Sequence, residues 1–388
     1  MTPVPLRVMM WSELFWPYIG GAEQFGARLI ASLQRRGVEF LVVTSHENLD
    51  LPDRMAHEGI SIRRFPLRRA LRERNPRVIH ELRNQIRDVK RTFAPDLVHV
   101  NAIGPSVLFH LHTQRDCVAP SLVRLQQEVL PSEINRNDSL LFHALASAGW
   151  VVGCSDAVLG QATGLAPSIA ARSSTIRNGI SNVPDYPPPL PSGAPRLVCL
   201  GRLVHAKGFE TAITATAILM RRFPSLRLDI AGDGAERPAL EQRVRDLGLQ
   251  AAVRFLGWID PSGVADVLTA ATIVLLPSCR EGLPAVAVQA AAMARPVVAT
   301  AVGGVPEIVV DNETGFLVPQ NDSAALADAV AVLLENPALA TRFGHAGYHR
   351  VRAQFGWNEC VDAYDALYYK LTGRHDVTAE SARHTQHD

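Results

Sequence analysis

Residues 277–319 read PSCREGLPAVAVQAAAMARPVVATAVGGVPEIVVDNETGFLVP, and this stretch decides the fold. An apolar run, Ile273–Leu276, comes just before it and has the length of a buried parallel strand. A polar loop follows, and we expect Pro284 at the first position of a helix built from Ala, Val, Gln and Met. A strand at 296–300, a Gly-Gly loop and a second proline repeat the scheme. The stretch therefore predicts consecutive βα units of a parallel sheet.

The loop before Pro284 has the chemistry of a ligand-binding site. The helix after Pro284 would point its free N–H groups and its positive dipole end at the carboxyl edge of the sheet, where an anion binds. Glu281 lies in the same loop and accepts hydrogen bonds from hydroxyl groups, whereas it would repel phosphate alone. A sugar joined to a diphosphate fits both features. Each glycine by itself is equally explained as a tight turn of any βαβ unit.

The chain divides around a proline-rich segment. Residues 181–195 hold six prolines, and we interpret residues 183–195 as a linker between domains 1–182 and 196–356. The polar end, 373–388, is expected to be disordered. Helical patterns alternate on both sides with ten predicted strands, at 6–10, 40–44, 97–101, 121–125, 150–154, 196–200, 227–231, 253–256, 272–276 and 296–300. This alternation predicts two Rossmann-like α/β domains, each with a parallel sheet, and ligands in the cleft between their carboxyl edges.

The bulk composition excludes several classes of protein. Of the 388 residues 47% are hydrophobic, and a net charge of +1 gives no case for a nucleic-acid partner. Five cysteines without a CxxC pair predict a reduced compartment. We expect neither a signal peptide nor a membrane-spanning helix. No histidine or cysteine set has zinc spacing, so we expect no metal and no cofactor.

A run of arginines lies between Arg63 and Arg91. The run also contains Arg64, Arg68, Arg69, Arg72, Arg74, Arg77, Arg83 and Arg87. It predicts either a peripheral contact with an anionic membrane surface or acidic acceptor, or a solvated helix face with interspersed acidic residues.

Two cations follow the first strand of the second domain, in the loop Gly201–Gly208. Arg202 and Lys207 stand five residues apart at a strand's carboxyl end, where they can hold a diphosphate and offset its charge as it leaves. Lysine occurs only at positions 90, 207 and 370, so a surface cation here would more often have been arginine. The alternative is a plain surface loop.

Other features at predicted strand ends are weaker. Gly20 and Gly21 let backbone N–H groups approach a phosphate or an acceptor, although such a pair is often only a turn. Trp258 ends a strand where the backbone can contact a nucleobase, or it caps the core. The sequence has no GxSxG, no Ser-x-x-Lys and no GxxxxGK[ST], which disfavours a protein nucleophile and phosphoryl transfer from ATP.

An ordered set of motifs along nearly the whole chain resembles the GT4 family of retaining glycosyltransferases. The motifs are Gly20-Gly21, Asn178-Gly179-Ile180, Gly201-Arg202 with Lys207-Gly208, Gly232-Asp233-Gly234, Phe255-Leu256-Gly257, Glu281-Gly282-Leu283-Pro284, Gly303-Gly304-Val305-Pro306-Glu307 and Asn312 to Val318. The resemblance implies the GT-B fold, with two Rossmann-like domains facing an interdomain cleft. Phe355-Gly356-Trp357 resembles the entry to the family's closing helix, about 357–372, which crosses back onto the first domain.

The resemblance also implies roles for single residues. Arg202 and Lys207 would hold the donor diphosphate and stabilise it as it departs without a metal ion, and Glu281 would accept from a donor-sugar hydroxyl. The backbone of Gly282, Leu283 and Pro284 would hold sugar and phosphate, and Gly20 and Gly21 would lie near the phosphate and acceptor. The family's reaction is described as attack on the face that the leaving group departs from, which needs no protein nucleophile.

Two positions depart from the family pattern. Gln289 stands where the family has a second glutamate for the nucleotide ribose; an amide can still bind a diol, without charge assistance. Gln127 and Glu128 stand where the family carries a Thr-x-His-Asp-like segment near the donor sugar and acceptor. Gln127 can orient a hydroxyl but cannot transfer a proton at neutral pH.

The leading hypothesis is therefore a cytoplasmic hexosyltransferase-like enzyme, with peripheral contact at the inner face of the membrane as a variant. It would move a sugar from a UDP- or GDP-sugar to a hydroxyl on a glycan, a lipid-linked saccharide or a small molecule, as in cell-surface polysaccharide or glycolipid synthesis. The alternatives are a sugar-nucleotide epimerase on the same fold and a non-catalytic subunit that binds nucleotide sugars.

Overall fold

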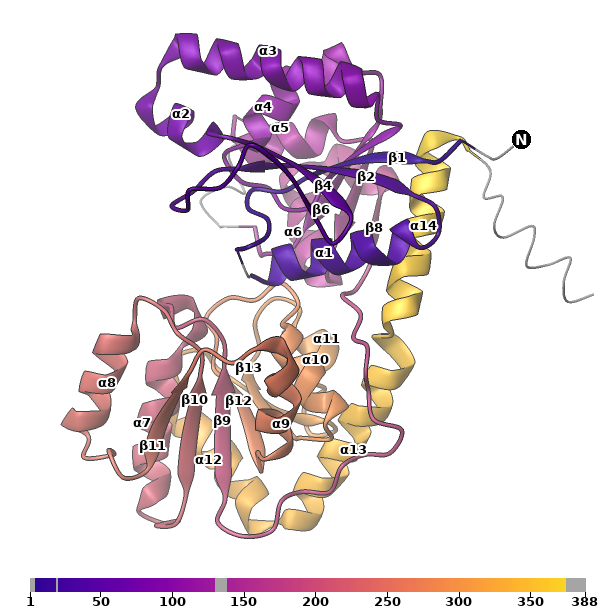
Figure 1. The fold of residues 1–388 in the computed structure, drawn as a ribbon. Helices are drawn as coiled ribbons and strands as arrows, with labels where there is room; N and C mark the ends of the chain where they lie inside the picture. Colours follow the sequence, from indigo (N-terminus) through magenta and orange to yellow (C-terminus); the bar gives the residue numbers. More distant parts are fainter. Residues whose placement is uncertain (1–3, 19, 130–137, 375–388) are drawn as a thin grey trace, which may run out of the picture. The chain divides into compact units, whose positions relative to one another are not determined.

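The computed structural model describes residues 4–18, 20–129 and 138–374 (Figure 1). The chain forms two compact units. One consists of Met1–Arg177 with Asn358–Asp388, and the other of Asn178–Trp357. Most of the predicted tail, residues 375–388, lies outside the described residues.

The first unit is built on an eight-stranded sheet in the order β3-β4-β2-β1-β5-β6-β7-β8. Its strands are β1 (Arg7–Trp11), β2 (Glu39–Ser45), β3 (Arg54–His57), β4 (Ile60–Phe65), β5 (Leu97–Val100), β6 (Ser121–Leu125), β7 (Trp150–Gly153) and β8 (Ser173–Thr175). Strands β5 and β6 are buried along their full length, as expected of parallel strands covered on both faces.

The helices of the first unit are α1 (Gly21–Gln34), α2 (Leu67–Glu73), α3 (Pro76–Phe93), α4 (Val107–His112), α5 (Leu140–Ser147), α6 (Asp156–Leu165) and α14 (Trp357–Thr372). Three of them, α3, α5 and α6, begin at a residue whose side chain caps them. The Asn75 side chain accepts from two backbone N–H groups of α3, and Pro76 takes the first helical position. Ser139 and Ser155 cap α5 and α6 in the same way.

One edge of this sheet differs from the prediction of purely parallel sheets. Strand β3 pairs antiparallel with β4 through a turn at Glu58 and Gly59, both of which have positive φ. Such a turn suits the twist of a two-residue hairpin, although Glu58 is an unusual residue for it. We did not predict either strand, because the register of the hairpin depends on these two residues with positive φ.

The second unit contains a six-stranded parallel sheet in the order β11-β10-β9-β12-β13-β14. Its strands are β9 (Arg196–Leu200), β10 (Arg227–Ala231), β11 (Val253–Gly257), β12 (Ile273–Leu276), β13 (Val297–Thr300) and β14 (Gly315–Val318). Its helices are α7 (Phe209–Met220), α8 (Arg237–Asp246), α9 (Val264–Thr269), α10 (Ala285–Ala292), α11 (Val305–Ile308), α12 (Ser323–Glu335) and α13 (Pro337–Gln354). Helix α7 packs on α12, and α10 packs on α13.

The strands of the opening stretch lie where the sequence placed them. Strands β12 and β13 are neighbours, and both are buried throughout. Pro306 lies in the first turn of α11, as predicted. Pro284, in contrast, is the residue before α10: its ψ of 113° is extended, and the helix begins at Ala285. The prediction for Pro284 was therefore wrong by one position.

The proline-rich segment is attached to the second unit by side chains of that unit. The Arg295 guanidinium is buried and donates to the carbonyl oxygens of Pro188, at 2.9 Å, and Pro189, at 2.6 Å. Desolvation by burial lowers the pKa of Arg295 to about 10. Tyr348 Oη donates to the carbonyl of Pro184. These contacts give residues 184–189 a fixed path along the unit.

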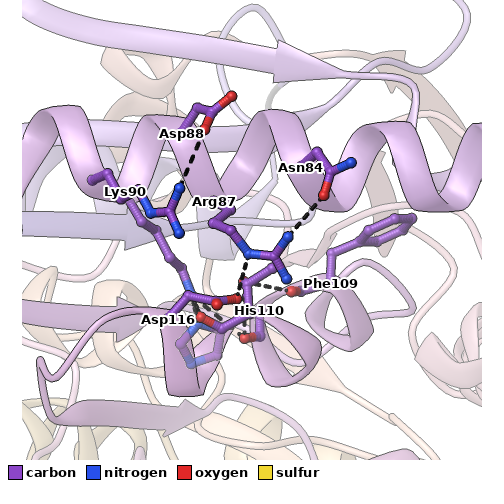
Figure 2. Close-up of polar contacts among 9 residues, drawn as sticks. Asn84, Arg87, Asp88, Lys90, Phe109, His110 and Asp116 are labelled. Carbon is purple, nitrogen blue, oxygen red and sulfur yellow. Dashed lines mark hydrogen bonds and ion pairs between the residues drawn. The ribbon is translucent and has the colours of Figure 1, made fainter.

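The basic run 63–91 is neither one helix nor wholly solvated, so the interpretation as a solvated helix face holds only in part. Arg64 lies in β4, is buried and donates to the carbonyls of Trp16 and Pro52. In α3, Arg87 pairs with Asp116 at 2.8 Å, and Lys90 is buried against His110 (Figure 2). The exposed cations are Arg69, Arg72, Arg74, Arg77 and Arg91.

Among the described residues, no single helix is long and apolar enough to cross a membrane; only α12 and α13 together pass that test, with a bend of 104° between them. No group of three or more potential metal ligands gathers in the described ranges.

Candidate functional site

The loops at the carboxyl edge of the second sheet are joined by backbone contacts. The Cys279 N–H, in the loop after β12, donates to the Ala206 carbonyl in the loop after β9, at 2.8 Å. Leu203 N–H donates in turn to the carbonyl of Asp233, after β10, at 2.9 Å. Gly208 has a φ of +63°, and a Cβ there would collide with the carbonyl of Pro277. Glycine at 208 therefore permits both the turn and the close approach of the two loops.

Lys207 and Glu281 meet at this edge, although 74 positions separate them in the sequence. Lys207 Nζ lies 2.6 Å from Glu281 Oε1. The Glu281 side chain is 7% exposed and that of Lys207 is 30% exposed. A buried carboxylate is stable only with such partners, since burial of an unpaired charge is costly. The pair places one cation and one acceptor side by side.

Ser278 is a site residue that our sequence analysis missed. Its Oγ donates to Glu281 Oε1 at 2.7 Å, and the residue has no exposed surface. Thr300, at the end of β13, donates through Oγ1 to the Ser278 carbonyl. The sequence signal was a hydroxyl three residues before Glu281 in the same loop.

Arg202 is on the same edge but is not joined to the pair. It is the second residue after β9 and is exposed, and within the described residues its guanidinium has no hydrogen-bond or ion-pair partner. The structure thus brings together Lys207 and Glu281, and leaves Arg202 available to a ligand.

The loop before α10 presents backbone groups and Gln289. Gly282, Leu283 and Pro284 are buried, and the Gly282 carbonyl accepts from Gly304 N–H at 2.9 Å, which joins the loops after β12 and β13. Gln289 lies in α10 and is half-buried; its amide contacts no polar group in the described part of the chain. Trp258, just after β11, is 54% exposed.

The remaining predicted residues belong to the first unit. Gly20 is the residue before α1, with extended backbone, and Gly21 begins the helix. A Cβ at Gly20 would collide with the Glu23 carboxylate, so glycine at 20 leaves space for that side chain. Gln127 and Glu128 follow β6, and Gln127 is exposed.

The edge of the second sheet offers three kinds of group for a ligand. Lys207 and Arg202 attract anions, Glu281 accepts from hydroxyl groups, and the start of α10 supplies backbone N–H groups and the positive end of a helix dipole. This set matches a molecule that contains both phosphate and hydroxyl groups.

Sequence profiles of two protein families cover most of the chain. The profile described as "Glycosyl transferase 4-like domain" matches residues 20–177, and that described as "Glycosyl transferases group 1" matches residues 187–350.

Curated relatives share part of their sequence with the chain. A glycogen synthase of Mycobacterium tuberculosis is 33% identical over 220 residues, which cover 56% of this chain and 53% of that protein. The chain thus spans about half the length of this relative. An alpha-maltose-1-phosphate synthase of the same organism is 29% identical over 72% of this chain and 83% of its own length.

Solved structures share the fold over nearly the full length. Sucrose-phosphate synthase from Thermosynechococcus elongatus superimposes with a TM-score of 0.80, at 24% identity, over 95% of this chain and 99% of that one. HepE of Anabaena, solved in complex with UDP, gives a TM-score of 0.72 at 18% identity, over 94% of this chain and 100% of that one. Both sheets therefore belong to a GT-B fold.

Proposed function

Because the chain belongs to the GT4 family of glycosyltransferases, we propose that it transfers a sugar from a nucleotide-diphosphate sugar to a hydroxyl group, with retention at the anomeric carbon. The observation that carries this proposal is the contact between Lys207 and Glu281 at the carboxyl edge of the second sheet. The chemistry of the pair suits the two halves of such a donor, its phosphates and its sugar hydroxyls.

Each residue would have a defined part in the reaction. Lys207 and Arg202 would bind the diphosphate and stabilise the charge that develops on it as the glycosidic bond breaks. Glu281 would accept a hydrogen bond from a donor-sugar hydroxyl and so orient the ring. The acceptor hydroxyl would attack the face that the diphosphate leaves, and the departing phosphate oxygen would take its proton. This route needs no covalent intermediate with the protein.

The choice of donor and acceptor is also a proposal. The Anabaena neighbour was solved with UDP and, in another crystal, with UDP and glucose, which supports a UDP-sugar as the first donor to test. GDP-sugars are the second. For the acceptor we propose a hydroxyl of a glycan, a lipid-linked saccharide or a small molecule, held by the first unit near Gly20, Gly21 and Gln127.

Contact with an anionic membrane is proposed for the exposed arginines 72, 74 and 77 around the turn between α2 and α3. Sedimentation with vesicles of phosphatidylcholine alone and with vesicles that also contain phosphatidylserine tests it. Equal binding to both vesicles would oppose this contact.

A thermal-shift panel followed by product analysis tests the function. UDP, GDP, ADP and their glucose or mannose conjugates are added in turn, and a ligand at a hundred times its Kd should add about 2.7 kcal/mol of stability. The stabilising donor is then incubated with hydroxyl acceptors. A glycosylated acceptor with a retained anomeric configuration supports the proposal; a changed sugar still joined to its nucleotide indicates an epimerase, and binding without turnover indicates a non-catalytic subunit.

A further inference from the structure

The two carboxylate oxygens of Glu281 have different surroundings. Both of its donors, Lys207 Nζ at 2.6 Å and Ser278 Oγ at 2.7 Å, bind Oε1. No donor in the described ranges contacts Oε2. The Glu281 side chain is 7% exposed and is held in place through Oε1. Oε2 therefore remains available to accept a hydrogen bond from a ligand.

Hydrogen bonds on the backbone of Ser278 and of the next residue fix the position of Ser278. Its carbonyl accepts from Thr300 Oγ1 at the end of the neighbouring strand β13. The N–H of the next residue, Cys279, donates to the Ala206 carbonyl. The hydroxyl contacts no second acceptor among the described residues, so its proton serves Glu281 alone. A rigid donor of this kind orients its partner more strongly than the lysine does, whose side chain is 30% exposed.

We propose that Ser278 is a positioning residue, which holds Glu281 through Oε1 and thereby directs Oε2 to a hydroxyl of the bound sugar. This inference rests on the proposed function, because it names the group that prepares Glu281 for the donor sugar. Lys207 shares Oε1 and retains two further N–H groups, so its contact with Glu281 and a contact with the diphosphate are compatible. Ser278 therefore governs recognition of the sugar and leaves recognition of the nucleotide to other groups.

The first experiment tests, without any ligand, whether Ser278 keeps the Glu281 carboxylate in contact with Lys207. The chain has only three lysines, so acetic anhydride labelling followed by mass spectrometry gives the reactivity of Lys207 relative to Lys370 in one sample. In Ser278→Ala the carboxylate can turn away from Lys207, and we expect labelling of Lys207 to rise about threefold. Glu281→Gln sets the upper limit, and Ser278→Thr should restore the original value.

A matched variant controls for the loss of a buried hydroxyl. Thr216, in α7, has no exposed surface and donates to the Ala212 carbonyl of its own helix. Thr216→Val should leave the labelling ratio unchanged. The inference is overturned if Ser278→Ala labels like the original protein, or if Thr216→Val raises labelling as much.

The second experiment measures sugar recognition by titration calorimetry with UDP and UDP-glucose. We expect Ser278→Ala to weaken UDP-glucose about tenfold, because it disturbs the carboxylate that accepts from the sugar. The Kd for UDP should change less than about twofold, because Lys207 can contact the diphosphate with or without Glu281. With turnover, the loss should appear as a higher KM for UDP-glucose, and Ser278→Thr should recover most of it. Equal weakening of both ligands would instead assign Ser278 a purely structural role.

Failure of the proposed function gives a different result from failure of this inference. If the original protein binds none of UDP, GDP, ADP and their sugar conjugates, the proposed function fails, and the labelling ratio alone decides whether Ser278 holds Glu281. If it binds them and transfers sugar, an unchanged Ser278→Ala overturns the inference and leaves the function standing.

Discussion

At the residue scale, Lys207 has two partners to serve, the Glu281 carboxylate and the diphosphate of a donor. We expect Lys207→Ala to lower kcat/KM about a hundredfold, because it removes charge stabilisation from the leaving group and frees a buried carboxylate. Steady-state kinetics with the donor from the thermal-shift panel checks this. Lys370→Ala is the control, since Lys370 lies over the Trp150 ring in the first unit. A rate within twofold of the original would remove Lys207 from the assigned role.

Substitution of Gln289 tests whether α10 binds the nucleotide ribose. The half-buried amide has no polar partner in the described part of the chain, so a glutamate would enter the position without breaking a contact. We expect Gln289→Glu to tighten UDP about threefold, because a carboxylate accepts more strongly from the ribose diol. Calorimetry with 2′,3′-dideoxy-UDP supplies the control, for which the two proteins should be equal. Weaker UDP binding in Gln289→Glu would place the ribose elsewhere.

At the element scale, α14 is held to the first unit by a buried polar contact that titrates. His99 Nδ1, in β5, lies 2.5 Å from Tyr368 Oη of α14, and the His99 side chain is fully buried. Desolvation, and secondarily the charge of Arg124, lower the pKa of His99 to about 3. In the unfolded chain the pKa of His99 keeps its ordinary value near 6.5. Between pH 6.5 and 3 the unfolded chain therefore binds a proton at His99 that the folded chain does not bind. The contribution of neutral His99 to the free energy of unfolding is therefore fully present above pH 6.5 and is lost as the pH falls toward 3.

Replacement of His99 should reduce the sensitivity of the fold to acid. Urea unfolding at pH 7 and pH 5 should show that the original protein loses about 2 kcal/mol more than His99→Asn between these two values. Burial and the charge of Lys90 keep the pKa of His110 well below its usual value, so His110 contributes equally to both proteins. Equal losses in the two proteins would mean that His99 is protonated in the folded state.

Local patterns predicted the elements better than their contacts. The predicted strands 121–125, 196–200 and 227–231 agree with β6, β9 and β10 to the residue, because short apolar runs between turn residues define a buried strand. The antiparallel hairpin of β3 and β4 was missed, since its register depends on two residues with positive φ. The burial of Arg64 depends on carbonyls of residues 16 and 52, which no local pattern indicates.

At the scale of the whole molecule, the site depends on contacts that are distant in the sequence. Motif order identified Lys207 and Glu281 separately, but only the packing of the β9 and β12 loops shows that they form an ion pair. Ser278 was missed for the same reason: its hydroxyl acquires a function only when Thr300 and Ala206 fix the backbone around it.

Binding of a nucleotide should therefore slow amide hydrogen exchange in several separate segments of the second unit. We expect UDP to slow amide hydrogen exchange in residues 201–208, 281–289 and 303–307, because these segments form the joined loops at the edge of the second sheet. Residues 63–91 of the first unit should exchange at the same rate with and without UDP, which makes them an internal control. Mass spectrometry of peptic peptides from the full chain gives both in one measurement. Protection confined to residues 20–34 or 121–128 would place the nucleotide on the first unit, and would contradict the assignment of Lys207 and Glu281 to the donor.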